Sequence, residues 1–221
     1  MTNKNELIIE MAPFLRNDQY NFIKFQLNHL VHAQTTVRDE DILSALKLNA
    51  YDKMVALFPE LKESQKALLQ KLIEFENVEQ VERLVSELKG YVIPFKYVSE
   101  KTVAKLFPKA KKLKMPVLED IDFRELSYLG WYDVRSERKF LIFNDDKSLI
   151  GIQGTFKGKM RGICSLCNRH EDVGLFMATV KSGMETYTSR GNYICHDSFT
   201  CNQNVITLER LTNFVKLIKK N

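Results

Sequence analysis

The four cysteines of this 221-residue chain are confined to one short region, as the run Cys164-Ser165-Leu166-Cys167 followed by Cys195 and Cys201. A two-residue gap lets a tight turn point both thiolates at one atom, and Zn2+ prefers four soft ligands in a tetrahedron. The second pair has a wider gap, which a turn around Asp197 and Ser198 can span. The pattern therefore predicts one zinc ion held by Cys164, Cys167, Cys195 and Cys201.

Other uses of these thiols fit the same spacing. Four unrelated buried thiols or two disulfides would match the count, but disulfides conflict with a cytoplasmic location. A C-x-x-C pair also occurs in thioredoxin-like redox motifs, yet no βαβ pattern precedes Cys164. His170 and His196 lie close enough in sequence to replace one cysteine. Because four thiolates leave no open position for water or substrate, the metal is expected to stabilise the fold rather than to catalyse a reaction.

Charge is distributed unevenly along the chain. Residues 1–93 contain 11 Lys and Arg against 14 Asp and Glu, a net charge of −3, whereas residues 94–221 contain 22 against 14, a net charge of +8. The basic part favours an anionic partner, with a solvated lysine-rich surface as the plain alternative. The pattern also changes at Pro94, so two domains are expected, 1–93 and 94–221.

Apolar residues recur at helical spacing throughout the first domain. On the second expected helix the predicted buried stripe consists of Ile42, Leu43 and Leu46. His29 and His32 lie three residues apart and could share a metal, but no cysteine or carboxylate on that face completes a set. Short connections favour an antiparallel helical bundle. Its helices are expected from Asn17, from about Val37, over Leu48–Phe58, from about Glu63, and from Asn77 to Gly90.

The second domain changes to strand patterns, because aromatic and β-branched residues dominate. The chain is therefore expected to be α+β: an amino-terminal helical bundle followed by a mixed α/β carboxy-terminal domain with a four-cysteine zinc finger. The carboxy-terminal domain is also expected to contain a short helix over Ser99–Phe107, the basic segment Lys109–Lys114 and a final helix over Ile206–Lys219. Strands are expected at Tyr128–Asp133, Lys139–Phe143 and Leu149–Phe156, with Asn144–Lys147 as a turn.

Several function classes are not expected. No stretch approaches the ~20 consecutive apolar residues of a membrane span, so a cytoplasmic location without membrane contact is predicted. The sequence has no glycine-rich phosphate loop, nucleophile elbow or paired-carboxylate motif, so an enzyme is not expected. The remaining function class is recognition of a macromolecular partner. The best candidates for contact residues are Tyr193 and Arg190, because the metal would fix the chain at Cys195, just beyond them.

Three segments around the cysteines carry a family resemblance: Arg161–Asn168, Gly174–Met177 and Gly191–Asn202. The resemblance extends back through Val92–Phe95, residues 111–116 and Leu129–Trp131, and so covers most of the chain from about residue 90. These residues resemble the fusidic acid resistance proteins of the FusB/FusC type, which bind elongation factor G. Members of that family have a helical bundle followed by a zinc domain, and they help release the factor from a ribosome where the drug has stalled it.

The resemblance implies that this chain is a ribosome-protection factor, a monomer with one structural Zn2+ held by the four cysteines. Its implied partner is elongation factor G, bound through the zinc domain in the ribosome complex. The family commonly has phenylalanine where Ile163 stands and lysine where Arg190 stands. Partner contacts are implied at Ile163, Arg190, Tyr193 and Phe214.

An alternative function follows from the basic charge alone. A zinc-containing RNA-binding protein would contact ribosomal RNA through phosphates, with a steep salt dependence. The basic cluster lies far in sequence from the aromatic candidates, and no recognised stacking motif is present. In this alternative, the residues that contact RNA phosphates would be Lys105, Lys109, Lys111, Lys112 and Lys114.

Overall fold

The computed structural model of this chain describes residues 11–110, 113, 115–145, 148–182 and 187–219, which form two compact units. Unit 1 comprises Met1–Leu15 and Phe22–Ile93, and unit 2 comprises Arg16–Asn21 and Pro94–Asn221. The second unit thus includes a short segment from within the predicted first domain. Lys111, Lys112, Lys114 and positions 146–147 of the predicted turn lie outside the described residues.

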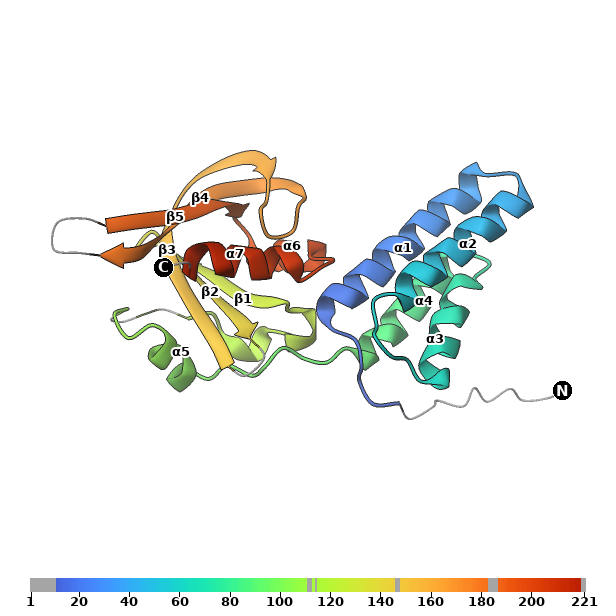
Figure 1. Cartoon of the computed structure of the whole chain (residues 1–221), viewed down its shortest axis with the longest axis horizontal. Helices are drawn as coiled ribbons and strands as arrows, with labels where there is room; N and C mark the ends of the chain where they lie inside the picture. Colours follow the sequence, from blue (N-terminus) through green and yellow to red (C-terminus); the bar gives the residue numbers. More distant parts are fainter. Residues whose placement is uncertain (1–10, 111–112, 114, 146–147, 183–186, 220–221) are drawn as a thin grey trace. The chain divides into compact units, whose positions relative to one another are not determined.

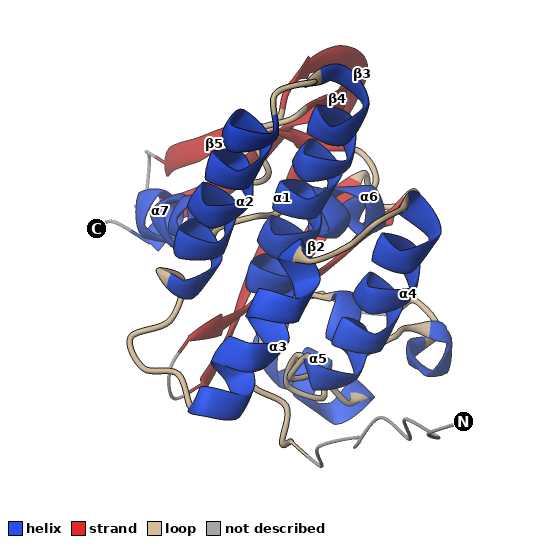
Figure 2. Ribbon diagram, turned by 90° about the vertical axis from the view of Figure 1, so that its right-hand side faces the viewer, coloured by secondary structure: helices blue, strands red, loops and turns tan. Residues whose placement is uncertain are grey.

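Unit 1 is helical, as predicted (Figure 2). Asp39 caps its second helix by accepting from the amides of Asp41 and Ile42, and Asn77 caps the fourth by accepting from the amide of Gln80. These caps satisfy amides that have no partner within their own helix. None of the helices in the described part of the chain has the length and hydropathy needed to cross a membrane. The four helices are α1 (Asn17–Thr36), α2 (Glu40–Val55), α3 (Glu63–Ile73) and α4 (Val78–Leu88).

One helix prediction in unit 1 was wrong. The two helices expected between Val37 and Phe58 are the single helix α2, since no glycine or proline interrupts it. Ile42 and Leu46, predicted to be buried, are 52% and 37% exposed. They share a four-residue spacing with Ala50 and Met54, which are buried. The stripe therefore exists, but only its second half is covered.

Unit 2 is built on a five-stranded antiparallel sheet with the strand order β1-β2-β3-β4-β5 (Figure 1). The first three strands were predicted, although β3 continues well beyond Phe156, and the last two were not. In the second half of β3, Gly158 has a positive φ of 78° and the pairing register shifts between Lys157 and Met160. Such a bulge breaks the two-residue alternation that marks a strand in sequence. The strands are β1 (Tyr128–Asp133), β2 (Arg138–Asp145), β3 (Ser148–Ile163), β4 (His170–Ser182) and β5 (Tyr187–Cys195).

Apolar clusters lie on both faces of β2. Leu141 and Phe143 belong to the cluster that contains Phe214, whereas Phe140 and Ile142 belong to the cluster that contains Phe107. Helix α7 contacts β4 and β5, α6 contacts β1 and β5, and α5 contacts β3. The predicted α+β class is therefore confirmed. The helices of this unit are α5 (Glu100–Leu106), α6 (Ser198–Asn204) and α7 (Glu209–Lys219), with 3-10 turns at Leu118–Asp120 and Phe123–Glu125.

Candidate metal centre

The first two cysteines lie in a tight turn directly after β3. The amide of Cys164 donates to the carbonyl of Arg169 at 3.0 Å, and the amide of Asn168 donates to the carbonyl of Cys164 at 2.9 Å. Asn168 has a φ of 58°, a left-handed conformation that asparagine tolerates better than most residues. This closed turn places the thiols of Cys164 and Cys167 on the same side.

The other two cysteines come from the end of β5 and from α6. Cys195 is the last residue of β5, and Cys201 lies in the middle of α6. Asp197 caps α6 by accepting from the amides of Phe199 and Thr200 at 3.2 and 2.9 Å. Burial alone would raise the pKa of this carboxyl, but the hydrogen bonds from Thr200 and Phe199 lower it overall.

Asn202 attaches α6 to the sheet. Its side-chain oxygen accepts from the amide of Ser127 at 2.7 Å, and its side-chain nitrogen donates to the carbonyl of Tyr128 at 2.9 Å. Asn202 is 1% exposed, so these bonds are shielded from water. The helix that presents Cys201 is therefore fixed against β1.

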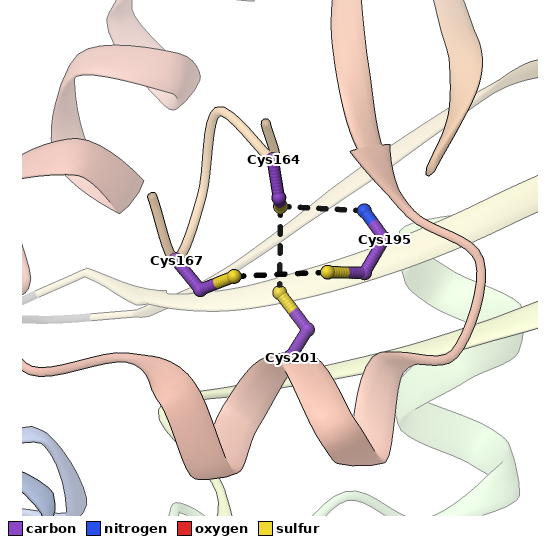
Figure 3. Close-up of side chains that lie close together, drawn as sticks. All are labelled: Cys164, Cys167, Cys195 and Cys201. Atoms are coloured by element: carbon purple, nitrogen blue, oxygen red, sulfur yellow. Dashed lines mark hydrogen bonds between the residues drawn. The ribbon is translucent and has the colours of Figure 1, made fainter. Parts of the chain in front are cut away.

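The four sulfur atoms point at one another (Figure 3), and all lie within 4.8 Å of each other. Cys164 Sγ is 3.7 Å from Cys201 Sγ, and Cys167 Sγ is 3.6 Å from Cys195 Sγ. A regular tetrahedron with Zn–S bonds of ~2.3 Å has sulfur–sulfur edges of about 3.8 Å. Disulfides would need about 2.05 Å, so the four buried thiols are free.

The donor set and its geometry fit one structural zinc ion. Within the described ranges, these thiols are the only group of three or more His, Cys, Asp or Glu side chains close enough to hold a metal. His29, His32 and His170 are exposed, and His196 is partly buried, so no histidine joins the set. The redox and unrelated-thiol alternatives do not account for four sulfurs that converge on one point.

Hydrogen bonds to sulfur stabilise the thiolate form of Cys164. The amides of Leu166 and Cys195 each donate to Cys164 Sγ at 3.3 Å. Bonds from the neighbouring thiols of Cys167 and Cys195 hold the pKa of Cys164 well below the usual value for a thiol. The same contacts with Cys164 raise the pKa of Cys195 and Cys201. Because zinc binds the thiolate, metal binding would release protons from the site.

Sequence reasoning missed Lys139, which lies beside the centre. It was read as the first residue of a strand, where a lysine is usually exposed, but it is 1% exposed. Its Nζ donates to the carbonyls of Cys195 at 3.0 Å and His196 at 2.6 Å, and it lies 4.8 Å from the ring centroid of Phe156. Burial lowers the pKa of Lys139 to about 8, against the attraction of the Cys201 thiolate.

The four implied partner contacts do not form one continuous patch. Ile163 and Tyr193 are 64% and 42% exposed, whereas Phe214 is 4% exposed and packs 5.7 Å from Phe176, ring to ring. The guanidinium of Arg190 donates to the carbonyl of Leu217 in the last turn of α7 at 3.1 Å. Of the four residues, only Ile163 and Tyr193 are therefore exposed to a large extent.

Strand geometry separates Arg190 from Tyr193. The β4–β5 register is regular from Ser189 to Cys195, so residues an odd number apart point to opposite faces. Arg190 lies on the face covered by α7. Tyr193 lies on the other face, where its cross-strand neighbour on β4 is Leu175. A hollow of about 320 Å³ brings Ile163 and Phe214 together with Arg210 and Leu217. Leu175 and Leu217 are partly exposed apolar residues that the sequence pattern did not identify.

The fold and the site define a treble-clef zinc-finger protein with an additional helical unit. Two family models match the chain: "Elongation factor G-binding protein, N-terminal" over residues 14–96, and "FBP C-terminal treble-clef zinc-finger" over residues 105–217. The chain belongs to the FusB/FusC family of fusidic acid resistance proteins.

One similar solved structure is titled "Structure of the fusidic acid resistance protein FusC". It matches with a TM-score of 0.83 and 30% sequence identity, and the match covers 95% of this chain and 100% of that chain. No curated protein sequence matches the chain. The similarity thus extends over both units rather than over the zinc finger alone.

Proposed function

We propose that this protein binds elongation factor G through unit 2, releases it from a drug-stalled ribosome and so protects translation from fusidic acid. The match of both family models carries the binding part of the proposal, since the model over residues 14–96 is described as elongation factor G-binding. The choice of unit 2 rests on its exposed apolar residues. The protein would act in the cytoplasm, as a monomer, by binding rather than by catalysis. The zinc would hold the turn at Cys164, the end of β5 and α6 together behind the binding surface.

The binding surface would centre on β5, the last strand of the sheet. On one face, Leu175 and Tyr193 are direct cross-strand neighbours and are 37% and 42% exposed. On the other face, Ile163 and Leu217 line the hollow and are 64% and 40% exposed. Because β5 is the last strand of the sheet, a partner that covers this edge reaches both faces. Exposed aromatic and aliphatic anchors of this kind usually supply most of an interface's energy.

Arg190 and Phe214 would contribute indirectly. The hydrogen bond from Arg190 places a positive charge at the carboxyl end of α7, where it stabilises the negative end of the helix dipole. Phe214 packs that helix onto the sheet through Phe143 and Phe176. Both residues would therefore fix the position of α7 and of the hollow, and offer a partner little surface of their own.

Calorimetric titration with purified elongation factor G tests the proposal. One-to-one binding is expected, and Tyr193→Ala should weaken it about 30-fold, which corresponds to the hot-spot threshold of about 2 kcal/mol. The matched control is Tyr97→Ala, which removes another tyrosine of unit 2 that is 71% exposed and lies outside the proposed surface. An absence of binding by folded, zinc-loaded protein would refute the proposal.

The release step needs a separate experiment. Ribosomes carrying elongation factor G and fusidic acid are sedimented with and without the protein, and the factor left in the pellet is measured. The wild type should move the factor to the supernatant, and Tyr193→Ala should do so only at higher concentration. If the factor stays in the pellet at saturating protein, the protein binds the factor without releasing it.

Contact with ribosomal RNA is the second candidate, favoured by the net charge of +8 on residues 94–221. Some of the basic side chains in that range are, however, already paired with carboxylates: Lys157 pairs with Glu137 at 3.6 Å, and Lys159 and Arg161 pair with Asp172 at 3.2 and 3.6 Å. A ribosomal RNA fragment titrated at several salt concentrations decides the question. Tight binding would favour the RNA contact if the logarithm of the association constant falls steeply with the logarithm of the salt concentration.

A further inference from the structure

Lys139 is a buried cation that neither the zinc ligands nor the proposed binding surface explains. In the described part of the chain it is the one lysine or arginine whose side chain is buried. Its two hydrogen-bond acceptors are the carbonyls of Cys195, a predicted zinc ligand, and of the next residue, His196. The ammonium therefore lies directly behind the metal centre.

A buried ammonium needs compensation. The effective penalty for taking such a charge out of water is several kcal/mol unless an opposite charge offsets it. Two carbonyl dipoles and the face of Phe156 offset part of the penalty, but they carry no net charge. No carboxylate lies within ion-pairing distance of Lys139 among the described residues, and Asp197 attracts it from farther away.

The metal centre supplies more negative charge than the single carboxylate of Asp197. Four thiolates on one Zn2+ carry a net charge of about −2. The two amide–sulfur bonds to Cys164 reduce the local field but cannot neutralise it. Cation and anion thus share one buried region, and each relieves the burial cost of the other.

We infer that Lys139 is the counter-charge of the zinc centre and a positioning residue for Cys195. Through charge, it favours the four-thiolate zinc-bound state over the metal-free state. Through its hydrogen bonds, it fixes the backbone from which Cys195 reaches the metal. Mutation of a residue that hydrogen-bonds to a metal ligand typically lowers metal affinity 10- to 100-fold.

Two substitutions separate charge from hydrogen bonding. Lys139→Met removes both and keeps most of the apolar volume, whereas Lys139→Gln keeps a donor and removes only the charge. The matched control is Lys157→Met, a lysine on the adjacent strand whose side chain is 71% exposed. All variants are purified as full chains loaded with zinc, and their helical content is compared by circular dichroism.

The readout is zinc itself, so the test is independent of elongation factor G. Zinc affinity and release rate are measured by competition with a chromogenic chelator. We expect Lys139→Met and Lys139→Gln to bind zinc 10- to 100-fold more weakly and to release it faster, with no change in Lys157→Met. Wild-type affinity in Lys139→Gln would overturn the counter-charge role, and this variant decides the matter if Lys139→Met does not fold.

Discussion

The side-chain nitrogen of Asn21 donates to the backbone oxygen of Asn202 at 2.7 Å, which joins the start of α1 to the helix that carries Cys201. The same nitrogen donates to the carbonyl of Val205 at 2.9 Å, and Asn17 adds a third bond to Asn202 at 3.3 Å. These carbonyls lie at the carboxyl end of α6, where a helix has no internal donors left for them. Residues 16–21 therefore belong to unit 2, although they lie far from it in sequence.

Asn21→Ala should destabilise unit 2. The substitution leaves the Val205 carbonyl without its donor, at a cost of about 1–3 kcal/mol, whereas the Asn202 carbonyl keeps its longer bond from Asn17. Urea unfolding followed by tryptophan fluorescence measures this, since Trp131 is the only tryptophan and lies in β1 of unit 2. Asn28→Ala, an exposed asparagine of the same helix, is the control and should change stability by less than about 0.5 kcal/mol. Equal stability of the two variants would show that water replaces the lost donor.

Zinc removal should unfold unit 2 before unit 1. The four thiols belong to the same buried cluster as Phe156 and Phe176, so loss of the metal leaves repelling or reprotonated thiols inside the core. A strong chelator should shift the emission of Trp131 to the red, because the ring is 8% exposed in the folded state. Helical circular dichroism should fall only in part, since α1 to α4 do not contain the ligands. An unchanged Trp131 spectrum in metal-free protein would contradict a structural role for the zinc.

The metal centre could be predicted from sequence because its signal is local and chemical. Cys164 and Cys167 have a spacing that few other structures use, and the helix that carries Cys201 begins where a turn was expected. The α+β class followed from helical periodicity in one part and from aromatic, β-branched runs in the other. Elements with strong periodicity were thus the ones that sequence reasoning found.

The missed features depend on tertiary contacts. The second half of β3, β4 and β5 all contain glycines and charged residues, so neither period is clear in sequence. Lys139 looks like an exposed strand end until the turn after β5 folds over it and supplies two carbonyls. That Arg190 and Tyr193 point to opposite faces could not be predicted, because β5 itself was not predicted as a strand. None of these facts has a short-range signature.

Gly191→Ala should disrupt the proposed binding edge. A methyl group at this position would overlap the carbonyl oxygen of Phe176 on β4, so the two strands must separate. A loss of more than about 2 kcal/mol in stability is expected, as for other backbone overlaps, together with weaker partner binding. Gly90→Ala serves as control because no atom lies within 4 Å of the added methyl group. Chemical denaturation of both variants measures the difference, and similar midpoints would show that β5 can shift without cost.

Phe214 and Ile163 should respond in opposite ways to truncation, which tests the division between supporting and contacting residues. Phe214→Ala removes a buried ring and should cost about 3–5 kcal/mol of stability, since the cavity between α7 and the sheet can only partly collapse. Ile163→Ser should change stability by less than about 0.5 kcal/mol, because the side chain is 64% exposed. It should nevertheless weaken binding to elongation factor G several-fold. Urea unfolding and calorimetric titration of both variants give the four values. Full binding by Ile163→Ser would remove that residue from the contact surface and leave Leu175 and Tyr193 as its centre.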